Sequence, residues 1–292
     1  MPEGDSVHKL ARRLEPTLLG RTIARSDLRV PRLATRDLAG REVRELATHG
    51  KHLLTRLGPG RDGSDDGVTL HSHLLMDGEW ATTGPGKQLP RRMMPEVRVV
   101  LETDRGTTAW GLRLHQLDLV ATRDEHRLVG HLGPDPLRAD FDHDEAVRRL
   151  RAEPAVPLVS ALLDQTKLAG LGNLWANELA FITGTSPWTP VGDLDVDRLV
   201  TNARRALRHS ALVPGAYQVT TGSSRRGEDH WVSGRARKPC LRCGTTVLVV
   251  ADLPDDPANR RTWWCPHCQP GPGPEARVPT PRSVRYGGGA SA

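Results

Sequence analysis

The run Gly170-Leu171-Gly172-Asn173-Leu174-Trp175-Ala176-Asn177-Glu178 lies in the most clearly helical part of the chain. Apolar residues recur at helical spacing from Leu174 to Ile182, and two glycines precede them. Because glycine has no Cβ, Gly170 and Gly172 allow two helices to approach closely through their backbones. Asn173 stands at the predicted start of the helix, where it can cap the helix, donate hydrogen bonds to a phosphate, or do both.

Further helices are predicted on both sides of this run, over Asp142–Ala152, Pro157–Gln165 and Val196–Leu212. Residues 1–125 have a different pattern, with a short helix from Asp5 to Leu18 followed by runs typical of strands. Examples of these runs are His52–Arg56, Val68–His73, Val97–Leu101 and Leu117–Ala121. The sequence therefore predicts an α+β fold, in which a helix leads into an antiparallel β-sandwich and a helical domain follows.

Four cysteines lie near the end of the chain in two Cys-x-x-Cys pairs, Cys240-Leu-Arg-Cys243 and Cys265-Pro-His-Cys268. Each pair can place two thiolates on one turn, and four thiolates can surround a zinc ion tetrahedrally. Such a closed site leaves no position for water, so we expect a structural Zn²⁺ ion that holds a β-hairpin. A pair of redox dithiols is the alternative. The hairpin would carry Arg260 and Arg261 near its tip.

The charge of the chain favours an anionic partner. Lys and Arg number 41 against 35 Asp and Glu, which gives a net charge of +6 and a pI near 9.5. Only five of the basic residues are lysines, and the planar guanidinium of arginine suits phosphate recognition. No run of eighteen or more apolar residues and no signal-peptide pattern is present, so we expect a cytoplasmic protein without membrane association.

The length of 292 residues exceeds the usual size of one domain, about 100–200 residues. We expect a catalytic β-sandwich domain over residues 1–125, a helical domain over 126–235 and a zinc finger over 236–269. Residues 270–292 are rich in Gly, Pro, Ser and Arg, and we expect a disordered tail there because the segment lacks apolar residues to pack.

Six blocks of this sequence, in this order and at these separations, resemble the formamidopyrimidine-DNA glycosylase and endonuclease VIII family. The blocks are Met1-Pro2-Glu3-Gly4-Asp5, Gly50-Lys51-His52-Leu53-Leu54, His73–Gly78, Leu132–Leu137, Gly170–Glu178, and the cysteine module with Arg260–Cys265. The resemblance covers residues 1 to about 269. It implies a β-sandwich flanked by helices, a helix–two-turns–helix domain and a zinc-finger hairpin, with damaged DNA bound by a monomer between two lobes.

The resemblance also implies a bifunctional DNA glycosylase and AP lyase whose nucleophile is the amine of Pro2, exposed by removal of Met1. An α-amine titrates near about 8 and is therefore more often unprotonated at neutral pH than a lysine. A secondary amine must form a charged iminium, which acts as an electron sink for cleavage of the strand by β,δ-elimination. Glu3 is expected to deliver a proton to the sugar ring oxygen. Lys51 is expected to neutralise a phosphate beside the reacting sugar.

Four residues are expected to contact DNA. By position in the family blocks, Asn173 and Arg260 bind the phosphates around the lesion, and Met76 fills the space that the flipped-out base leaves. After Trp110 the chain lacks the Arg-Arg-Phe-Gly turn typical of purine-directed members of the family, and Arg113 is the candidate for the inserted charged side chain.

The missing turn and the short segment between Thr220 and Cys240 favour the endonuclease VIII branch and oxidised pyrimidines as substrates. Two alternatives remain open from the sequence. The enzyme could be specific for oxidised purines, or the chain could be an inert zinc-finger protein that binds damaged DNA. The pair Pro2 and Glu3 favours an enzyme, because a binding protein needs no free proline amine followed by a carboxylate.

Overall fold

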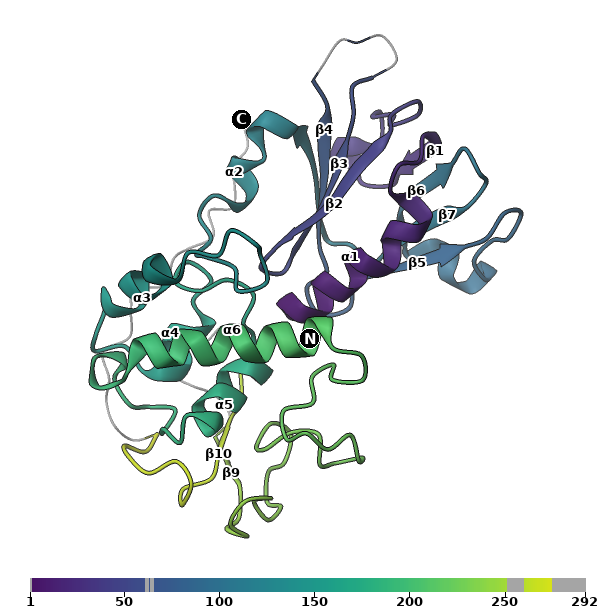
Figure 1. Cartoon of the computed structure of the whole chain (residues 1–292). Helices are drawn as coiled ribbons and strands as arrows, with labels where there is room; N and C mark the ends of the chain where they lie inside the picture. The colour runs from purple at the N-terminus through teal and green to yellow at the C-terminus, as the bar shows by residue number, and fades with distance from the viewer. Residues whose placement is uncertain (1, 61–62, 64–65, 251–259, 275–292) are drawn as a thin grey trace.

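Helix α1 (Gly4–Leu18) lies across the strands that follow it and also contacts the last long helix of the chain (Figure 1). The computed structural model describes residues 2–60, 63, 66–250 and 260–274. The helix starts directly after Glu3, whose backbone N–H donates to the Ser6 hydroxyl at 3.2 Å. Its apolar residues, among them Leu14 and Leu18, are buried against the strands. The predicted helix from Asp5 to Leu18 is confirmed.

Two four-stranded antiparallel sheets form the amino-terminal lobe. Their orders are β1-β6-β7-β5 and β2-β3-β4-β8. The strands are β1 (Ile23–Leu28), β2 (Val43–His49), β3 (His52–Leu57), β4 (Val68–His73), β5 (Glu79–Thr83), β6 (Val97–Thr103), β7 (Thr108–Leu112) and β8 (Gln116–Ala121). Leucines and valines from both sheets, such as Leu57, Leu70 and Leu101, pack in one core with α1. The predicted sandwich is therefore confirmed.

The second lobe is helical. It contains α3 (His143–Arg151), α4 (Leu158–Leu163), α5 (Asn173–Ile182) and α6 (Val196–Leu212), and the short α2 (His126–Val129) lies in the connection between the lobes. Trp175 of α5 is almost fully buried in the core that these helices share. Asp142 and Asp195 cap α3 and α6 by accepting backbone N–H groups three residues ahead. The helices predicted from periodicity are confirmed.

The cysteine module packs against the carboxyl-terminal end of α5. Strands β9 (Leu248–Val250) and β10 (Thr262–Trp264) pair antiparallel, which confirms the predicted hairpin; residues 251–259 between them lie outside the described part. Phe181 of α5 shares a small core with Val232, Val247 and the buried cysteines. The module is thus attached to the helical lobe through apolar contacts.

Beyond the module, the Ser186 hydroxyl donates to the carbonyl of Pro272, so the first residues after Gln269 still contact the helical lobe. Residues 275–292, the greater part of the predicted disordered tail, lie outside the described residues. Within the described ranges, the helices fall short of the length and apolar content that crossing a bilayer requires.

Candidate active site at the amino terminus

Glu3 is 1% exposed and its carboxylate lies at the amino-terminal end of α5. It accepts the backbone N–H groups of Gly172 and Leu174, each at 2.8 Å, and that of Trp175 at 3.3 Å. These are groups that a helix leaves without partners at its start, where the helix dipole also favours negative charge. Glu3 is thus anchored to a helix that begins 170 residues later, which restricts the position of Pro2 beside it.

Burial raises the pKa of Glu3 to about 7. The Lys51 ammonium and the N–H groups of Leu174 and Gly172 oppose this rise because they stabilise the carboxylate, whereas the neighbouring Asp5 adds to it. A carboxyl group that titrates near neutrality can both donate and accept a proton at physiological pH.

Gly172 leaves the space that the Glu3 carboxylate occupies. A Cβ on Gly172 would lie 2.5 Å from Glu3 Cδ and 2.6 Å from its Oε1. The backbone of Gly172 is extended, at φ −125° and ψ −162°, so an L-residue is excluded there by the carboxylate and not by backbone strain. The close approach expected at this glycine is therefore made to a side chain.

Three other glycines meet at the junction between the two lobes. The Gly4 N–H donates to the Gly170 carbonyl at 2.8 Å, and a Cβ on Gly4 would lie 2.9 Å from Gly170 Cα. Gly170 has φ +94° and packs against both Gly4 and Gly50. We call Gly4, Gly50 and Gly170 the glycine junction. The expected close approach at Gly170 thus joins the two lobes.

Lys51 occupies the two-residue turn between β2 and β3, after Gly50 with φ +57°. Glycine at the first central position suits a tight hairpin turn. Lys51 is half-buried, and burial lowers its pKa; Glu3 opposes this effect and Arg260 adds to it. The mutual electrostatic influence places Glu3, Lys51 and Arg260 in one cluster, as the sequence led us to expect.

Asp135 holds this turn against the helical lobe. Its buried carboxylate accepts the Gly50 N–H at 2.8 Å and the Leu137 N–H at 2.8 Å. Alongside, His49 Nε2 donates to the Gly133 carbonyl at 3.0 Å. The block Leu132–Leu137 therefore positions Lys51, although sequence reasoning gave Asp135 no role.

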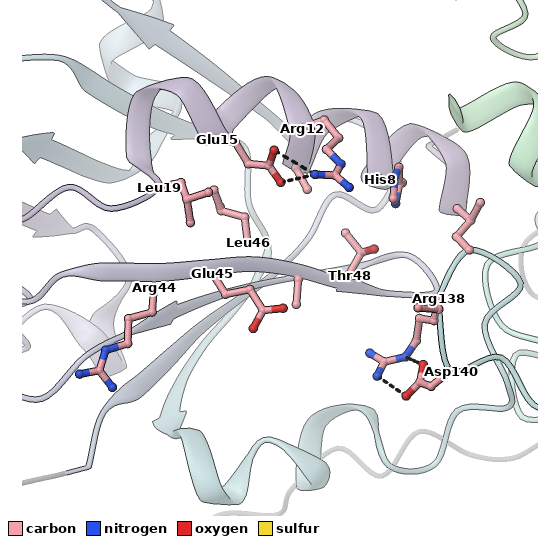
Figure 2. Close-up of a pocket in the computed structure, with 14 residues that line it drawn as sticks. His8, Arg12, Glu15, Leu19, Arg44, Glu45, Leu46, Thr48, Arg138 and Asp140 are labelled. Carbon is pink, nitrogen blue, oxygen red and sulfur yellow. Dashed lines mark hydrogen bonds and ion pairs between the residues drawn. The ribbon is translucent and has the colours of Figure 1, made fainter. Parts of the chain in front are cut away.

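Pro2 is half-buried and lines a cavity of about 690 Å³ between the lobes. The walls come from α1, from the turn between β4 and β5, and from the segment after α6. A second cavity of about 510 Å³ lies between α1 and β2, and Figure 2 shows ion pairs on its walls between Arg12 and Glu15 and between Arg138 and Asp140. Pro2 does not line that second cavity, and Glu3 lines neither of the two. The cavity at Pro2 is thus the candidate reaction site.

Asn173 connects α5 to the hairpin that carries Arg260. Its side-chain amide donates to the carbonyl of Arg261 at 2.9 Å. One turn later, Asn177 Oδ1 accepts the backbone N–H of Trp263 at 2.8 Å. Arg260 is half-buried, near enough to Lys51 to lower its pKa. The structure therefore brings Asn173, Arg260 and Lys51 together, and their contacts with phosphate stay predictions.

Two buried carboxylates that sequence reasoning did not single out fix the surroundings of this site. Asp5 accepts the Trp175 indole N–H at 3.1 Å and the Ser210 hydroxyl at 2.6 Å, and so links α1 to α5 and α6. Glu178 accepts three consecutive backbone N–H groups, those of residues 231–233, at 2.8 to 2.9 Å. Trp175 and Glu178 belong to the run that first indicated the helix. The acidic residue that follows the tryptophan in this run was the sequence feature from which a role for Glu178 could have been predicted.

Met76 lies in the turn between β4 and β5, where its side chain is 66% exposed. The neighbouring Leu75 is also exposed and has φ +49°. Exposed apolar side chains on a short turn fit the predicted wedge into DNA. Just before them, His73 Nδ1 accepts the Leu75 N–H at 3.0 Å, and burial, with the nearby Lys51, lowers the pKa of His73 to about 4. His73 therefore holds the turn as a neutral ring.

Arg113 contacts the same turn through its guanidinium. Its guanidinium donates to the Asp77 carbonyl at 2.8 Å and forms ion pairs with Glu79 at 2.9 Å and with Glu96. Arg113 also has φ +50°. Its insertion into DNA stays a prediction, and it would require the guanidinium to leave these three partners. The geometry shows it supporting the turn that carries Met76.

The four cysteine sulfurs lie within 4.8 Å of one another. Cys243 Sγ is 3.5 Å from Cys265 Sγ, and Cys240 Sγ is 3.9 Å from Cys268 Sγ. Zinc–sulfur bonds of about 2.3 Å in a tetrahedron place the sulfurs about 3.8 Å apart. The four cysteines thus have the arrangement needed to hold a metal ion, as their spacing predicted.

Comparison with known proteins agrees with this geometry. Residues 1–118 match the family model of the formamidopyrimidine-DNA glycosylase N-terminal domain, and residues 132–219 match that of the formamidopyrimidine-DNA glycosylase H2TH domain. A probable endonuclease 8 2 of Streptomyces coelicolor is 49% identical over 94% of this chain and 96% of its own length. The DNA-(apurinic or apyrimidinic site) lyase Nei2 of Mycolicibacterium smegmatis is 42% identical over 92% of this chain and 99% of its own.

The fold also matches solved structures. The Lactococcus lactis Fpg in complex with DNA that contains an abasic site superimposes with a TM-score of 0.72 over 92% of this chain and 100% of that one, at 23% sequence identity. At this identity the match establishes the fold alone. With both family models and close relatives in agreement, the chain belongs to the formamidopyrimidine-DNA glycosylase and endonuclease VIII family.

Proposed function

We propose that this protein is a bifunctional DNA glycosylase and AP lyase of base excision repair, which removes oxidised bases and cuts the strand by β,δ-elimination. The observation that carries the proposal is the arrangement at the amino terminus. Pro2 lines a cavity and is followed directly by the buried Glu3, whose pKa burial raises to about 7. The names of the relatives, endonuclease 8 and AP lyase, support the same activity.

In this mechanism the lone pair of the Pro2 nitrogen forms a bond to C1′ of the damaged nucleotide, and the base leaves with the electrons of the glycosidic bond and takes up the proton that the Pro2 nitrogen loses. Protonated Glu3 gives its proton to the ring oxygen as the C1′–O4′ bond opens, which leaves an iminium ion. The iminium withdraws electrons, so a proton is lost from C2′ and the 3′ phosphate departs. The 5′ phosphate follows in a second elimination, and water then releases Pro2.

Damaged DNA is the partner that fits the charged cluster. Lys51, Arg260 and Asn173 would bind the phosphates on either side of the flipped nucleotide, while Met76 would enter the gap in the helix. Each neutralised phosphate releases counterions, so we expect affinity to fall steeply as salt rises. Arg113 would either insert beside Met76, as predicted, or hold the turn in place.

We propose oxidised pyrimidines as the preferred bases. The support is the absence of the purine-directed Arg-Arg-Phe-Gly turn after Trp110, together with the endonuclease 8 names of relatives at 41% to 49% identity. Oxidised purines are the alternative, since relatives named formamidopyrimidine-DNA glycosylase are also similar, at 35% identity and below. A panel of oligonucleotides with one lesion each distinguishes them, because preferred release of oxoguanine opposite cytosine would exclude the pyrimidine assignment.

The metal that fits the four cysteines is zinc. Four thiolates at near-tetrahedral spacing form a closed structural site, in which the ion would hold the hairpin with Arg260 against α5. We also propose that the chain acts as a monomer in the cytoplasm, on chromosomal DNA. Its domains would divide near residues 125 and 235, since β8 ends at Ala121 and the cysteine module follows the loop that Glu178 holds.

Covalent trapping tests the proposed function. Borohydride should reduce the transient iminium and lock the protein onto DNA that contains an abasic site, with the peptide adduct at Pro2. Pro2→Gly or a retained Met1 should strongly reduce trapping and strand cleavage while DNA binding persists. Glu3→Gln should lose base release more severely than cleavage at a preformed abasic site. An adduct on Lys51 would refute the proline mechanism, and a wild-type protein that binds but never cuts would support the inert binding protein.

A further inference from the structure

One aromatic side chain that lines the cavity at Pro2 is exposed. Tyr217, in the segment after α6, is 43% exposed although it lines a cavity between two lobes. The other apolar walls are better covered, since Leu74 is 6% and Trp80 is 2% exposed. Among the large apolar and aromatic side chains that line this cavity, Tyr217 therefore has the largest exposed fraction.

The Tyr217 ring is held in place although it is exposed. Its hydroxyl lies 2.8 Å from the Ser6 hydroxyl, within hydrogen-bonding distance, and the Lys9 ammonium lies 5.5 Å from the ring centroid. Ser6 in turn accepts the backbone N–H of Glu3 at 3.2 Å. One hydrogen bond thus links the ring to Ser6, and Ser6 in turn binds the backbone of Glu3. A ring fixed in this way loses little conformational entropy when a ligand packs on it.

We propose that Tyr217 is the surface on which the flipped-out base stacks, and that this contact contributes most to the release of oxidised pyrimidines whose rings remain planar. The inference rests on the proposed function, because Pro2 must reach C1′. The base is bonded directly to C1′, so it must enter the cavity that Pro2 lines, where Tyr217 is the exposed aromatic face. Stacking on an aromatic side chain needs a flat base, and a saturated, puckered ring makes less contact.

Removal of such a stacking contact lowers binding by about 5- to 150-fold, so a loss of about tenfold or more is expected. The test uses single-turnover rates on two oligonucleotides that differ at one position, where one has 5-hydroxyuracil, a planar oxidised pyrimidine, and the other a preformed abasic site. Tyr217→Ala should slow release of 5-hydroxyuracil at least tenfold and leave abasic-site cleavage within about threefold of wild type. Tyr217→Phe keeps the ring and should retain most of the base release.

Leu212→Ala is the matched control, since Leu212 is 48% exposed near the same end of α6 but does not line the cavity. It should leave both rates unchanged. A third oligonucleotide with 5,6-dihydrothymine, whose ring is puckered, should show a smaller effect of Tyr217→Ala than 5-hydroxyuracil does.

Several outcomes would overturn the inference. An equal loss on abasic and base-containing DNA in Tyr217→Ala would mean that the ring supports the amino terminus and does not contact the base. An equal loss in Tyr217→Phe would assign the effect to the hydroxyl. Failure of the wild-type enzyme to release 5-hydroxyuracil while it cuts abasic DNA would also refute it. Absence of abasic-site cleavage in the wild type would instead refute the proposed function.

Discussion

Replacement of Gly172 by alanine tests whether the position of the Glu3 carboxylate governs base release. The added Cβ would lie 2.5 Å from Glu3 Cδ, whereas ordinary contact begins at 3.4 Å, so the carboxylate must move by about 0.9 Å (3.4 − 2.5). Such a shift breaks or lengthens the two 2.8 Å hydrogen bonds from Gly172 and Leu174. The backbone of residue 172 itself accepts alanine without strain.

Two magnitudes follow for Gly172→Ala. A misplacement of about 1 Å in a reacting group costs about 100-fold in rate, so single-turnover base release should fall by about that factor. Hydrogen bonds to a charged group contribute about 1.5–3 kcal/mol, and the reduced freedom of the unfolded alanine chain offsets about 0.4–1 kcal/mol. We therefore expect a net loss of about 1–2 kcal/mol in unfolding free energy, measured by denaturant titration.

Cleavage at a preformed abasic site should fall far less in Gly172→Ala, because the abasic sugar already exchanges with its open-chain aldehyde and does not need a proton from Glu3 to open the ring. Gly84→Ala is the matched control, since no atom lies within 4 Å of its Cβ position and its backbone is not in the left-handed region. It should retain wild-type rates and stability. Wild-type base release by folded Gly172→Ala protein would refute the argument that the fixed carboxylate of Glu3 is needed.

Three further predictions concern pH, salt and metal. Base release needs protonated Glu3, with its pKa of about 7, and a neutral Pro2 amine, whose pKa is about 8. Its rate should therefore peak near about pH 7.5, whereas abasic-site cleavage should rise to a plateau above about pH 8. Parallel pH–rate profiles for the two reactions would contradict this. Arg260→Ala should lower the slope of log affinity against log salt by about one unit in fluorescence-anisotropy titrations, and an unchanged slope would remove Arg260 from the phosphate contacts. Metal analysis should find one zinc per chain, and Cys265→Ser should lose it together with DNA affinity; full affinity without zinc would contradict a structural role.

Much of the architecture follows from local sequence pattern. β4 matches the predicted run Val68–His73 residue for residue, and α6 matches Val196–Leu212, because alternation and helical periodicity are local properties. β1 and β2 were not singled out, since each buries few side chains and its charged residues hide the alternation. The cysteine spacing predicted the metal-binding arrangement because each Cys-x-x-Cys pair places two thiolates on one turn, whatever the rest of the fold.

The site was predicted only where a family block marked it. Asp5 and Asp135 contribute through contacts with segments far along the chain, and no local pattern shows which buried carboxylate meets which N–H group. Tyr217 lies in an irregular segment without periodicity, so no local pattern indicated the cavity. Arg113 was expected at the DNA because of its position after Trp110, but three acceptors around the turn engage its guanidinium.

The glycine junction has a mechanical consequence. Gly4 and Gly170 meet main chain to main chain, where a Cβ on Gly4 would lie 2.9 Å from Gly170 Cα, and Gly50 packs against the other side of Gly170. The contact between Gly4 and Gly170 has no rotamers to rearrange, so it resists rotation of one lobe against the other close to Pro2, the proposed nucleophile. The duplex must then supply the distortion that brings a nucleotide to Pro2, and this costs least where damage has already weakened stacking. Stiffness of the protein at this junction thereby favours deformable sites in DNA before any base is read.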